Sequence, residues 1–559
     1  MSGRRFYNQG NWVKGISRRS FLLRAGLVMG GIMLQNCVRK AGGGSKYGRI
    51  NGSLRGPNAK AGHMLRDKTP MPEPTAGSEV DILIIGGGIS GLSAGRWLKK
   101  QGYNNFKLLE LEDHAGGNSW FGNNHISQYP LGAHYIPIVN NGDTLLIDFL
   151  KEKDVITHFD EKGLPFYNEY YLCFDPQERL LINGQWQEGI VPDFGVPNAD
   201  REQIIRFFAM TEKMKNARGN DGKWAFDIPV DNSSADDEYR KLDKLSFTDY
   251  LKDNGYNSTY LLWYLNYCCK DDFGSLAKDI SAWAGLHYFA SRRGKAGNTE
   301  PNSVITWPEG NGWLMKQLRD DISDHILTSQ MAYEVMMVDG GVHVKVTDTR
   351  SNQTRLIKAK KVIMASPQFV NQRILKDIKR DGVDYAAMHY SPWFIANISI
   401  NGLPTPEKGM VLCWDNVAYG TPSVGYVNAN QQDTRIIETQ KVLTWYLPLC
   451  DKEPRLSRLA AYTRSNEQWT DIVMDEMEQM HPGISNHVES IDMWLWGHGM
   501  IRPSTGYVWG DVRKNAKSPI DHKIFFAHTD LSGISIFEEG FHHGIRAAEE
   551  LIKSTYAGA

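Results

Sequence analysis

Three glycines between a predicted strand and a predicted helix form the clearest chemical motif of this 559-residue chain. Their spacing is G-x-G-x-x-G, at Gly86, Gly88 and Gly91. The first permits a tight turn, the second lets backbone approach a pyrophosphate, and the third lets helix pack on strand. A second apolar run, 106–109, ends in Glu110, which is placed to accept a hydrogen bond from a ribose hydroxyl. The alternative is a glycine-rich turn in an ordinary α/β protein, but the order of these elements favours a dinucleotide on the helix N-terminus.

Two adjacent glycines, Gly116 and Gly117, begin six residues after Glu110 and indicate which dinucleotide is bound. Residues 109–118 read L-E-L-E-D-H-A-G-G-N, which resembles the E-A-x-D-R-x-G-G-R signature of the flavin amine oxidase superfamily. This resemblance implies FAD as the cofactor. The two arginines of that signature are replaced here by His114 and Asn118. The second replacement removes a cation that would neutralise the cofactor phosphates.

Two later segments resemble the returning half of the FAD domain in the same family. A helix is expected from the glycines near 310 to about 322, followed by strands at 332–338, 341–348 and 354–359 and a buried strand at 361–366. In the family, the backbone of the first of these strands lies by the adenine, which implies a role for Val335. The strand at 524–526 leads to Asp530, and a closing helix with Glu539 near its start resembles the element that faces the flavin.

The resemblance implies an α/β fold with a discontinuous, Rossmann-like FAD-binding domain and a mixed α+β substrate-binding cap. The expected boundaries are 79–138, 300–370 and 490–559 for the FAD domain, 139–299 and 371–489 for the cap, 41–78 for a linker and 1–40 for a signal region. The implied FAD-binding residues are Gly86, Gly88, Ile89, Ser90, Gly91, Glu110, Leu111, Gly117, Asn118, Gly132, Ala133, His134, Val335, Asp530 and Glu539.

Four side chains are candidates for catalysis. The segment L-G-A-H-Y-I around His134 resembles the L-G-A-H-W-I of animal-type polyamine oxidases, where the histidine lies beside flavin and substrate. A histidine titrates near neutral pH, so His134 could keep an amine uncharged or relay a proton, unless it only bonds to backbone. Phe537 and Tyr446 are candidate aromatic walls, with a place in the core as the alternative. His498 approaches the last predicted FAD strand.

The substrate expected from these features is an amine, with polyamines favoured. Asp271 and Asp272 follow an aromatic run and would suit a remote positive charge, although a solvated charged pair is the plain alternative. The tail resembles that of bacterial spermidine dehydrogenase-like proteins. No cysteine lies in the last hundred residues, so FAD is expected to be non-covalent. A desaturase of apolar substrates and a non-catalytic carrier, as in GDP-dissociation inhibitors, are alternatives on the same fold. Oxygen, a quinone and a cytochrome all remain open as electron acceptors.

The N-terminus has the pattern of an export signal. No acid precedes Asp67, and residues 17–23 resemble the twin-arginine motif S-R-R-x-F-L-K, followed by an apolar run at 25–34 that is too short for a membrane span. We therefore expect passage through the twin-arginine translocon to the periplasm; a basic start of a cytosolic protein is the alternative. Cys37 ends a poor lipoprotein box, which leaves a lipid anchor open. The net charge of -1 gives no case for nucleic-acid binding, and no cysteine spacing suggests a metal site.

Overall fold

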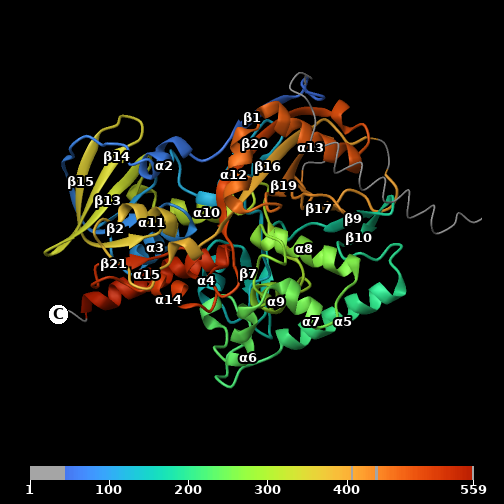
Figure 1. The fold of residues 1–559 in the computed structure, drawn as a ribbon, viewed down its shortest axis with the longest axis horizontal. Helices are drawn as coiled ribbons and strands as arrows, with labels where there is room; N and C mark the ends of the chain where they lie inside the picture. The colour runs from blue at the N-terminus through green and yellow to red at the C-terminus, as the bar shows by residue number, and fades with distance from the viewer. Residues whose placement is uncertain (1–44, 405–406, 435–438, 557–559) are drawn as a thin grey trace, which may run out of the picture. The chain divides into compact units, whose positions relative to one another are not determined.

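The computed structural model describes residues 45–404, 407–434 and 439–556 (Figure 1). The predicted signal region at 1–40, with its twin-arginine motif and Cys37, lies outside these residues. Residues 49–559 form one compact unit, to which everything below refers. Within the described ranges, no helix has the length and apolar character needed to cross a membrane. The described cysteines are buried and free, and the adjacent Cys268 and Cys269 form no disulfide.

A seven-stranded sheet carries the glycine motif. Its order is β12-β3-β2-β15-β14-β13, with β21 beside β15. The strands are β2 (Thr75–Ile85), β3 (Phe106–Leu109), β12 (Ile326–Leu327), β13 (Gln330–Val338), β14 (Gly341–Asp348), β15 (Thr354–Met364) and β21 (Ile524–Phe526). The first part of the sheet is parallel, whereas β13, β14 and β15 form an antiparallel meander. The sequence predicted all of these strands except the short β12, although the two strands expected at 354–366 are one continuous β15.

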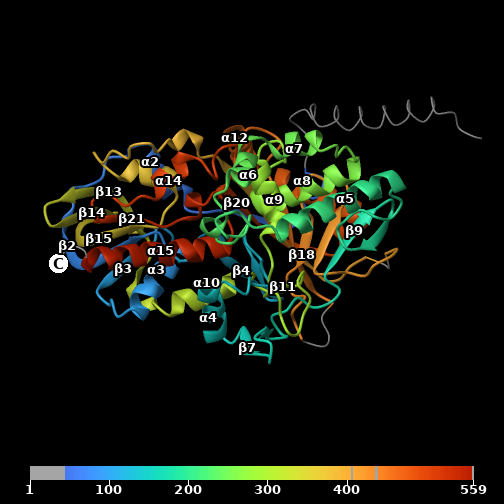
Figure 2. The same ribbon diagram turned by 90° about the horizontal axis from the view of Figure 1, so that it is seen from below.

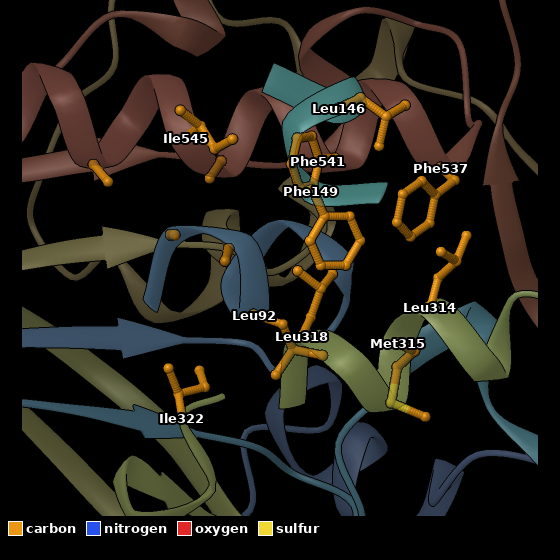
Figure 3. Packing of buried hydrophobic residues seen from close by; sticks show 14 of the residues in the cluster. Leu92, Leu146, Phe149, Leu314, Met315, Leu318, Ile322, Phe537, Phe541 and Ile545 are labelled. Atoms are coloured by element: carbon orange, nitrogen blue, oxygen red, sulfur yellow. The ribbon is translucent and has the colours of Figure 1, made fainter. Parts of the chain in front are cut away.

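Two helices cover one face of this sheet and pack closely on each other. α3 (Ile89–Lys100) follows the glycines, and α15 (Phe537–Tyr556) closes the chain; the two lie side by side in Figures 1 and 2. A Cβ added to Gly544 of α15 would lie 2.2 Å from the carbonyl oxygen of Ser90 in α3. This contact explains why a glycine stands one turn after the glycine at the start of α15. Side chains of α15 also meet α4 (Thr144–Glu152) and α10 (Gly312–Asp320) in a common core (Figure 3).

An eight-stranded sheet forms the second half of the unit. Its order is β1-β20-β16-β19-β18-β17-β9-β10. The strands are β1 (Asn51–Arg55), β9 (Glu178–Ile182), β10 (Gln185–Glu188), β16 (Tyr390–Ile400), β17 (Asp415–Ala418), β18 (Tyr426–Asn428), β19 (Lys441–Pro448) and β20 (Val488–Ile501). β16 is buried at every position because strands flank it on both edges and helices cover it.

This sheet revises two of the expected boundaries. Part of the expected linker is ordered: β1 pairs in parallel with β20, and α2 (Ala59–Arg66) follows it. β20 also runs through position 490, so residues 490–501 belong to this sheet and not to the FAD sheet. β1 has no strong local signal, because its sequence contains a single large apolar residue, Leu54, and the strand gains its order from the edge of β20.

Among the described residues, seven helices belong to the cap and pack on or near its sheet. They are α5 (Asn198–Lys215), α6 (Asp237–Arg240), α7 (Phe247–Asp253), α8 (Thr259–Phe273), α9 (Ala282–Ala290), α12 (Pro454–Thr463) and α13 (Asn466–Met480). α8 begins at Ser258, whose side chain accepts from the N–H of Leu261, and ends at Gly274 in a left-handed conformation. Apart from short 3-10 helices, the remaining elements of the described residues are α11 (Gln368–Ile374), α14 (Asp511–Lys517), β4 (Phe121–Asn123), β5 (Gln128–Pro130), β6 (Tyr135–Pro137), β7 (Ile156–Phe159), β8 (Pro165–Tyr167) and β11 (Val304–Thr306).

Candidate cofactor site and active site

The three glycines of the motif have different surroundings. Gly86 has φ +113°, and a Cβ on it would lie 2.7 Å from the carbonyl oxygen of Ala365. A Cβ on Gly91 would lie 1.9 Å from the carbonyl oxygen of Gly86. By contrast, a Cβ on Gly88 would meet no atom within 4 Å. The outer glycines therefore serve packing, whereas Gly88 faces open space that a ligand can enter.

The N-terminus of α3 is prepared for an anion. Gly88 is its N-cap residue, so no side chain caps the helix, and the first turn, which contains Ile89 and Ser90, has no acid. Gly117, in a left-handed conformation, closes the other side, since a Cβ on it would lie 3.2 Å from the Cα of Gly88. The free N–H groups and the helix dipole of such an end favour a phosphate.

Asn118, which replaces the arginine of the family signature, connects three parts of the site. Its side chain donates to the carbonyl oxygen of Gly499 in β20, and its own carbonyl oxygen accepts from the N–H of Ala133 at 3.2 Å. A Cβ on Gly132 would lie 2.2 Å from the same carbonyl oxygen. Asn118 thus holds the segment of Gly132 and Ala133 against the cradle. Because an amide carries no charge, Asn118 supplies no cation for the phosphates, which the N-terminus of α3 would stabilise.

Glu110 directly follows β3 beside the glycines, with Leu111 half-buried next to it. Its carboxylate accepts from the N–H of Gly87 at 2.7 Å and from the N–H of Glu112 at 2.9 Å. Burial raises the pKa of Glu110 to about 7. A carboxylate has about four lone-pair positions, so Glu110 can still accept from ribose hydroxyls.

The expected adenine contact at Val335 is not supported by its surroundings. Val335 is fully buried and is the strand partner of Val344 in β14. Its carbonyl oxygen accepts a hydrogen bond from the backbone N–H of Lys376. The start of β13 lies closer to the cradle, because the N–H of Gln330 donates to the carbonyl oxygen of Glu110 at 2.7 Å. Gln330 also has a buried side-chain oxygen without a partner. β13 is the strand that was expected beside the cofactor, but the residue of β13 that lies next to Glu110 is Gln330, five residues before Val335.

Two acids of the closing segment point in different directions. Asp530 is fully buried and accepts from the N–H of Gln368 at 2.8 Å and from the hydroxyl of Tyr390 at 2.6 Å. Although burial opposes ionisation, the neighbouring His528 and these donors lower the pKa of Asp530. Glu539 instead accepts from the N–H of Val230 at 2.6 Å, and burial raises its pKa to about 8. The position of Glu539 on α15 therefore joins the helix to the cap segment.

The cradle fits a dinucleotide cofactor. It combines open space at Gly88, an uncapped helix N-terminus, a carboxylate with unused acceptor capacity and an unpartnered buried oxygen on Gln330. FAD, when bound, would accept a hydride, and with it two electrons, from a substrate carbon.

His134 lies in a cluster of aromatic side chains. Its ring is stacked on that of Tyr446, with centroids 4.7 Å apart, and lies 5.1 Å from Tyr135 and 5.6 Å from Trp414. The hydroxyl of Tyr446 donates to the carbonyl oxygen of Gly132 at 3.1 Å. Burial lowers the pKa of His134 to about 4. The imidazole is therefore neutral at neutral pH, contrary to the expectation that it titrates there, and a proton relay by imidazolium is not supported.

The other two catalytic candidates lie elsewhere. Phe537 is buried in the core of α4, α10 and α15, where it packs near Leu314 and Phe541 (Figure 3). His498 stacks on Phe369, with centroids 4.5 Å apart, and desolvation by burial lowers its pKa to about 3. Neither ring contacts His134, so the structure brings together only His134 and Tyr446 of the four candidates.

The acids of α8 separate into two environments. Asp272 is buried and forms an ion pair with Arg292 at 3.2 Å. Asp271 has its Oδ2 atom 3.5 Å from the hydroxyl of Tyr135, in the aromatic cluster. Asp415 at the start of β17 accepts from the hydroxyl of Tyr267 at 3.2 Å.

Sequence reasoning missed three residues of this region: Trp414, Asp415 and Glu178. The dipeptide Trp414-Asp415 and the isolated Glu178 have no motif around them. They meet the aromatic cluster only because β9 and β17 pair in the cap sheet. Only Tyr135 could have been found from the sequence as a further member of the cluster, because it directly follows the candidate His134.

A dinucleotide cradle beside a sheet-and-helix cap is an arrangement typical of oxidoreductases that use a nucleotide cofactor. The model of the flavin-containing amine oxidoreductases matches residues 89–552. The chain belongs to this family, and its fold combines a Rossmann-like FAD domain with a cap.

Two curated relatives are similar to parts of this chain at low sequence identity. A flavin-containing amine oxidase of Oncorhynchus mykiss is 29% identical over 123 residues, which are 20% of this chain and 23% of the relative. An L-amino acid dehydrogenase of Synechocystis is 20% identical over 320 residues, or 55% of this chain and 61% of the relative. The alignments thus span less than two thirds of either relative.

Solved structures show a similar fold at low identity. Putrescine oxidase bound to putrescine has a TM-score of 0.61 and 15% identity, with 85% of this chain and 99% of that chain covered. Cyclohexylamine oxidase from Brevibacterium oxydans has the same TM-score and coverage at 14% identity. A putative protoporphyrinogen oxidase from Exiguobacterium has a TM-score of 0.57 at 12% identity, with 88% and 100% covered.

Proposed function

We propose that this protein oxidises an amine at the carbon next to nitrogen, and that polyamines are its preferred substrates. The observation that supports this most is the aromatic cluster of His134, Tyr135, Trp414 and Tyr446, which borders Gly132 and Ala133 next to the cradle. Flat aromatic walls orient an alkyl amine, and unpaired Asp271 beside Tyr135 attracts a second positive charge.

His134 and Tyr446 position the substrate in this proposal. A neutral imidazole can accept a hydrogen bond from an amine or donate one, but at pH 7 it is not the imidazolium that would act as a general acid. The bond from Tyr446 to Gly132 fixes the ring that stacks on His134. The substrate amine must be neutral when it reacts, because loss of hydride from the neighbouring carbon requires a free lone pair on nitrogen.

Three finer features also belong to the proposal. FAD is held non-covalently, in keeping with the lack of cysteine in the last hundred residues. The protein is exported to the periplasm by the twin-arginine translocon, with a lipid anchor at Cys37 as a further option. The electron acceptor is oxygen, a quinone or a cytochrome, since no feature described above discriminates between them.

An apolar substrate is the second candidate, because a putative protoporphyrinogen oxidase shares the fold. The unpaired carboxylate of Asp271 beside the aromatic cluster favours an amine, since a long apolar ligand gives no compensation for a buried charge.

An anaerobic screen tests the proposal directly. The purified flavoprotein is mixed with putrescine, spermidine, spermine, aromatic amines, amino acids and protoporphyrinogen, and the loss of flavin absorbance is followed. We expect rapid bleaching by a polyamine. Bleaching by the porphyrinogen alone would replace the proposed function with the second candidate.

A further inference from the structure

Four polar side chains form a closed network near the edge of the cap sheet made by β17, β9 and β10 (Figure 1). Arg179 of β9, Tyr426 of β18 and His481, which follows α13, are buried, and Glu407 is partly buried. Arg179 donates from Nη1 to Glu407 at 2.5 Å and from Nη2 to the hydroxyl of Tyr426 at 3.2 Å. His481 closes this polar network, with Nε2 2.6 Å from the hydroxyl of Tyr426 and Nδ1 bonded to Glu407.

The hydrogen bonds of the polar network fit one arrangement of protons. The hydroxyl of Tyr426 accepts from Arg179, so its own proton is free for Nε2 of His481. Nδ1 of His481 then carries the imidazole proton and donates it to Glu407. Burial lowers the pKa of His481; although burial opposes ionisation of Glu407, the bonds from His481 and Arg179 lower the pKa of that carboxyl. One guanidinium and one carboxylate therefore balance each other, and the imidazole is neutral.

Arg179 also holds the segment that leads to Trp414. Its Nη1 atom donates to the carbonyl oxygen of Met410 at 3.0 Å, and its guanidinium lies 3.8 Å from the ring of Trp186 in β10. The backbone of Trp186 donates to the carbonyl oxygen of Lys408 and accepts from the N–H of Met410. The polar network thus anchors residues 407–410 against β10.

Asn416 connects the polar network to the backbone of Trp414. This fully buried residue accepts at Oδ1 from Nε of Arg179 at 2.5 Å and from the N–H of Cys413 at 3.2 Å. Its Nδ2 atom donates to the carbonyl oxygens of Cys413 and Trp414 at 2.8 and 3.2 Å. Arg179 therefore fixes which way this amide points, and the amide fixes the turn that carries Trp414.

Trp414 lies at the end of this series of contacts, in the aromatic cluster. Its ring is 5.6 Å from that of His134 and 5.8 Å from that of Tyr135, nearly perpendicular to the latter. A buried ion pair adds little net stability, because desolvation offsets the attraction, and its best-attested role is to select one conformation. The conformation that this ion pair selects is that of the turn at Trp414.

We infer that Glu407 and His481 are positioning residues that act through Arg179 and Asn416 to orient Trp414 as a wall of the substrate site. This inference rests on the proposed function, because it identifies what holds one wall of the same site. The polar network thereby determines how tightly the substrate binds, although its own side chains belong to the edge of the cap sheet.

The test is a double-mutant cycle on flavin reduction by the best amine of the screen. Trp414→Leu removes the wall, whereas Glu407→Gln and Asn416→Asp alter the connection and keep side-chain shape. We expect each single variant to raise the substrate Kd about 5- to 50-fold and to leave the limiting rate within about 3-fold. In the Trp414→Leu background, the other two changes should raise the Kd by less than about 2-fold, because the wall that they orient is gone. Effects that add fully in this background would overturn the inference.

Stability is measured alongside, because a general loss of structure would not depend on Trp414. Glu407→Gln leaves Arg179 without its anion, so a lower Tm is expected in both backgrounds. Tyr426→Phe is the milder variant, since it keeps the ion pair and removes one hydroxyl, and it should raise the Kd by a few-fold. Asp243→Asn is the matched control: Asp243 is a buried acid of the cap that accepts from the N–H of Trp509, and its replacement should change the Tm but not the Kd.

The orientation of Trp414 can also be measured without turnover. In flavoprotein labelled with fluorotryptophan, the fluorine NMR signal of Trp414 is the one that disappears in Trp414→Phe. We expect this signal to shift in Glu407→Gln and Asn416→Asp and to keep its place in Asp243→Asn. If it shifts while no amine reduces the flavin, the proposed function fails and the positioning role is retained. If it keeps the parent position in both variants, the positioning role is disproved for any substrate.

Discussion

The cofactor cradle and the aromatic cluster lie within one compact unit but are built in different ways. The cradle consists mainly of backbone: Gly86, Gly91 and Gly117 bring main chains together, and Gly88 leaves the space between them open. The cluster consists of side chains: His134 comes from the FAD half, Tyr446 from β19 of the cap sheet, and Trp414 from the residue just before β17. A backbone site needs particular spacings in one segment, whereas a side-chain site needs a whole sheet to bring its members together.

The largest effect should come from placing a side chain in the cradle. Gly88→Val adds atoms where no protein atom lies within 4 Å, so the fold should persist while the pyrophosphate loses its place. We expect flavin content to fall to near zero with little change in the circular dichroism spectrum. Absorbance of the purified protein per chain measures the first quantity.

Gly91→Val is the contrasting variant for this prediction. Its Cβ would lie 1.9 Å from the carbonyl oxygen of Gly86, so the strand and helix cannot keep their positions. This variant should lose folded protein together with flavin. Full flavin content in Gly88→Val would show that the open space at Gly88 is not the pyrophosphate site.

The difference between a backbone cradle and a side-chain cluster explains why the sequence predicted the first better than the second. The spacing of the glycines and Glu110 predicted β2, α3 and β3, because these elements are local and each residue has a steric reason. The cluster was only partly foreseen: His134 and Tyr446 were candidates, but their stacking depends on the pairing of β16, β18 and β19. Phe537 lies in a hydrophobic core, which was the alternative left open for it, since a helix start beside a flavin and a helix start in the core have the same apolar pattern.

An intermediate effect should follow from disrupting the cluster without touching the cradle. His134→Ala removes the ring that stacks on Tyr446, and we expect FAD content to stay normal while anaerobic flavin reduction slows about 10- to 100-fold through loss of orientation. Tyr446→Phe keeps the stack and loses only the bond to Gly132, so a few-fold effect is expected. Stopped-flow reduction by the best substrate measures both. An unchanged rate in His134→Ala would remove this histidine from the active site.

The pH dependence of this rate further separates two roles for His134. Because burial lowers its pKa to about 4, the imidazole stays neutral from pH 6 to pH 9. The parent protein and His134→Ala should therefore show the same rise of reduction rate with pH, set by the amine. A rise with a midpoint near 6.5 that disappears in His134→Ala would restore the proton relay.

The smallest effect is on the pH dependence of the free energy of unfolding. It tests whether Glu110 of the cradle still has a hydrogen bond to make with FAD. The pKa of Glu110 is raised to about 7 in the flavin-free protein, so its contribution to stability is fully present below the unfolded value of about 4.5 and is lost as the pH rises through 7. Over that window Glu110 should lower the free energy of unfolding by about 3 kcal/mol, a loss that Glu110→Gln should abolish. Hydrogen bonds from ribose hydroxyls favour the carboxylate, so FAD should flatten the slope in the parent protein. Urea unfolding of flavin-free and flavin-loaded protein between pH 4.5 and pH 8 measures this difference. An equal slope with and without FAD would mean that Glu110 is satisfied by Gly87 and Glu112 alone and does not bind the ribose.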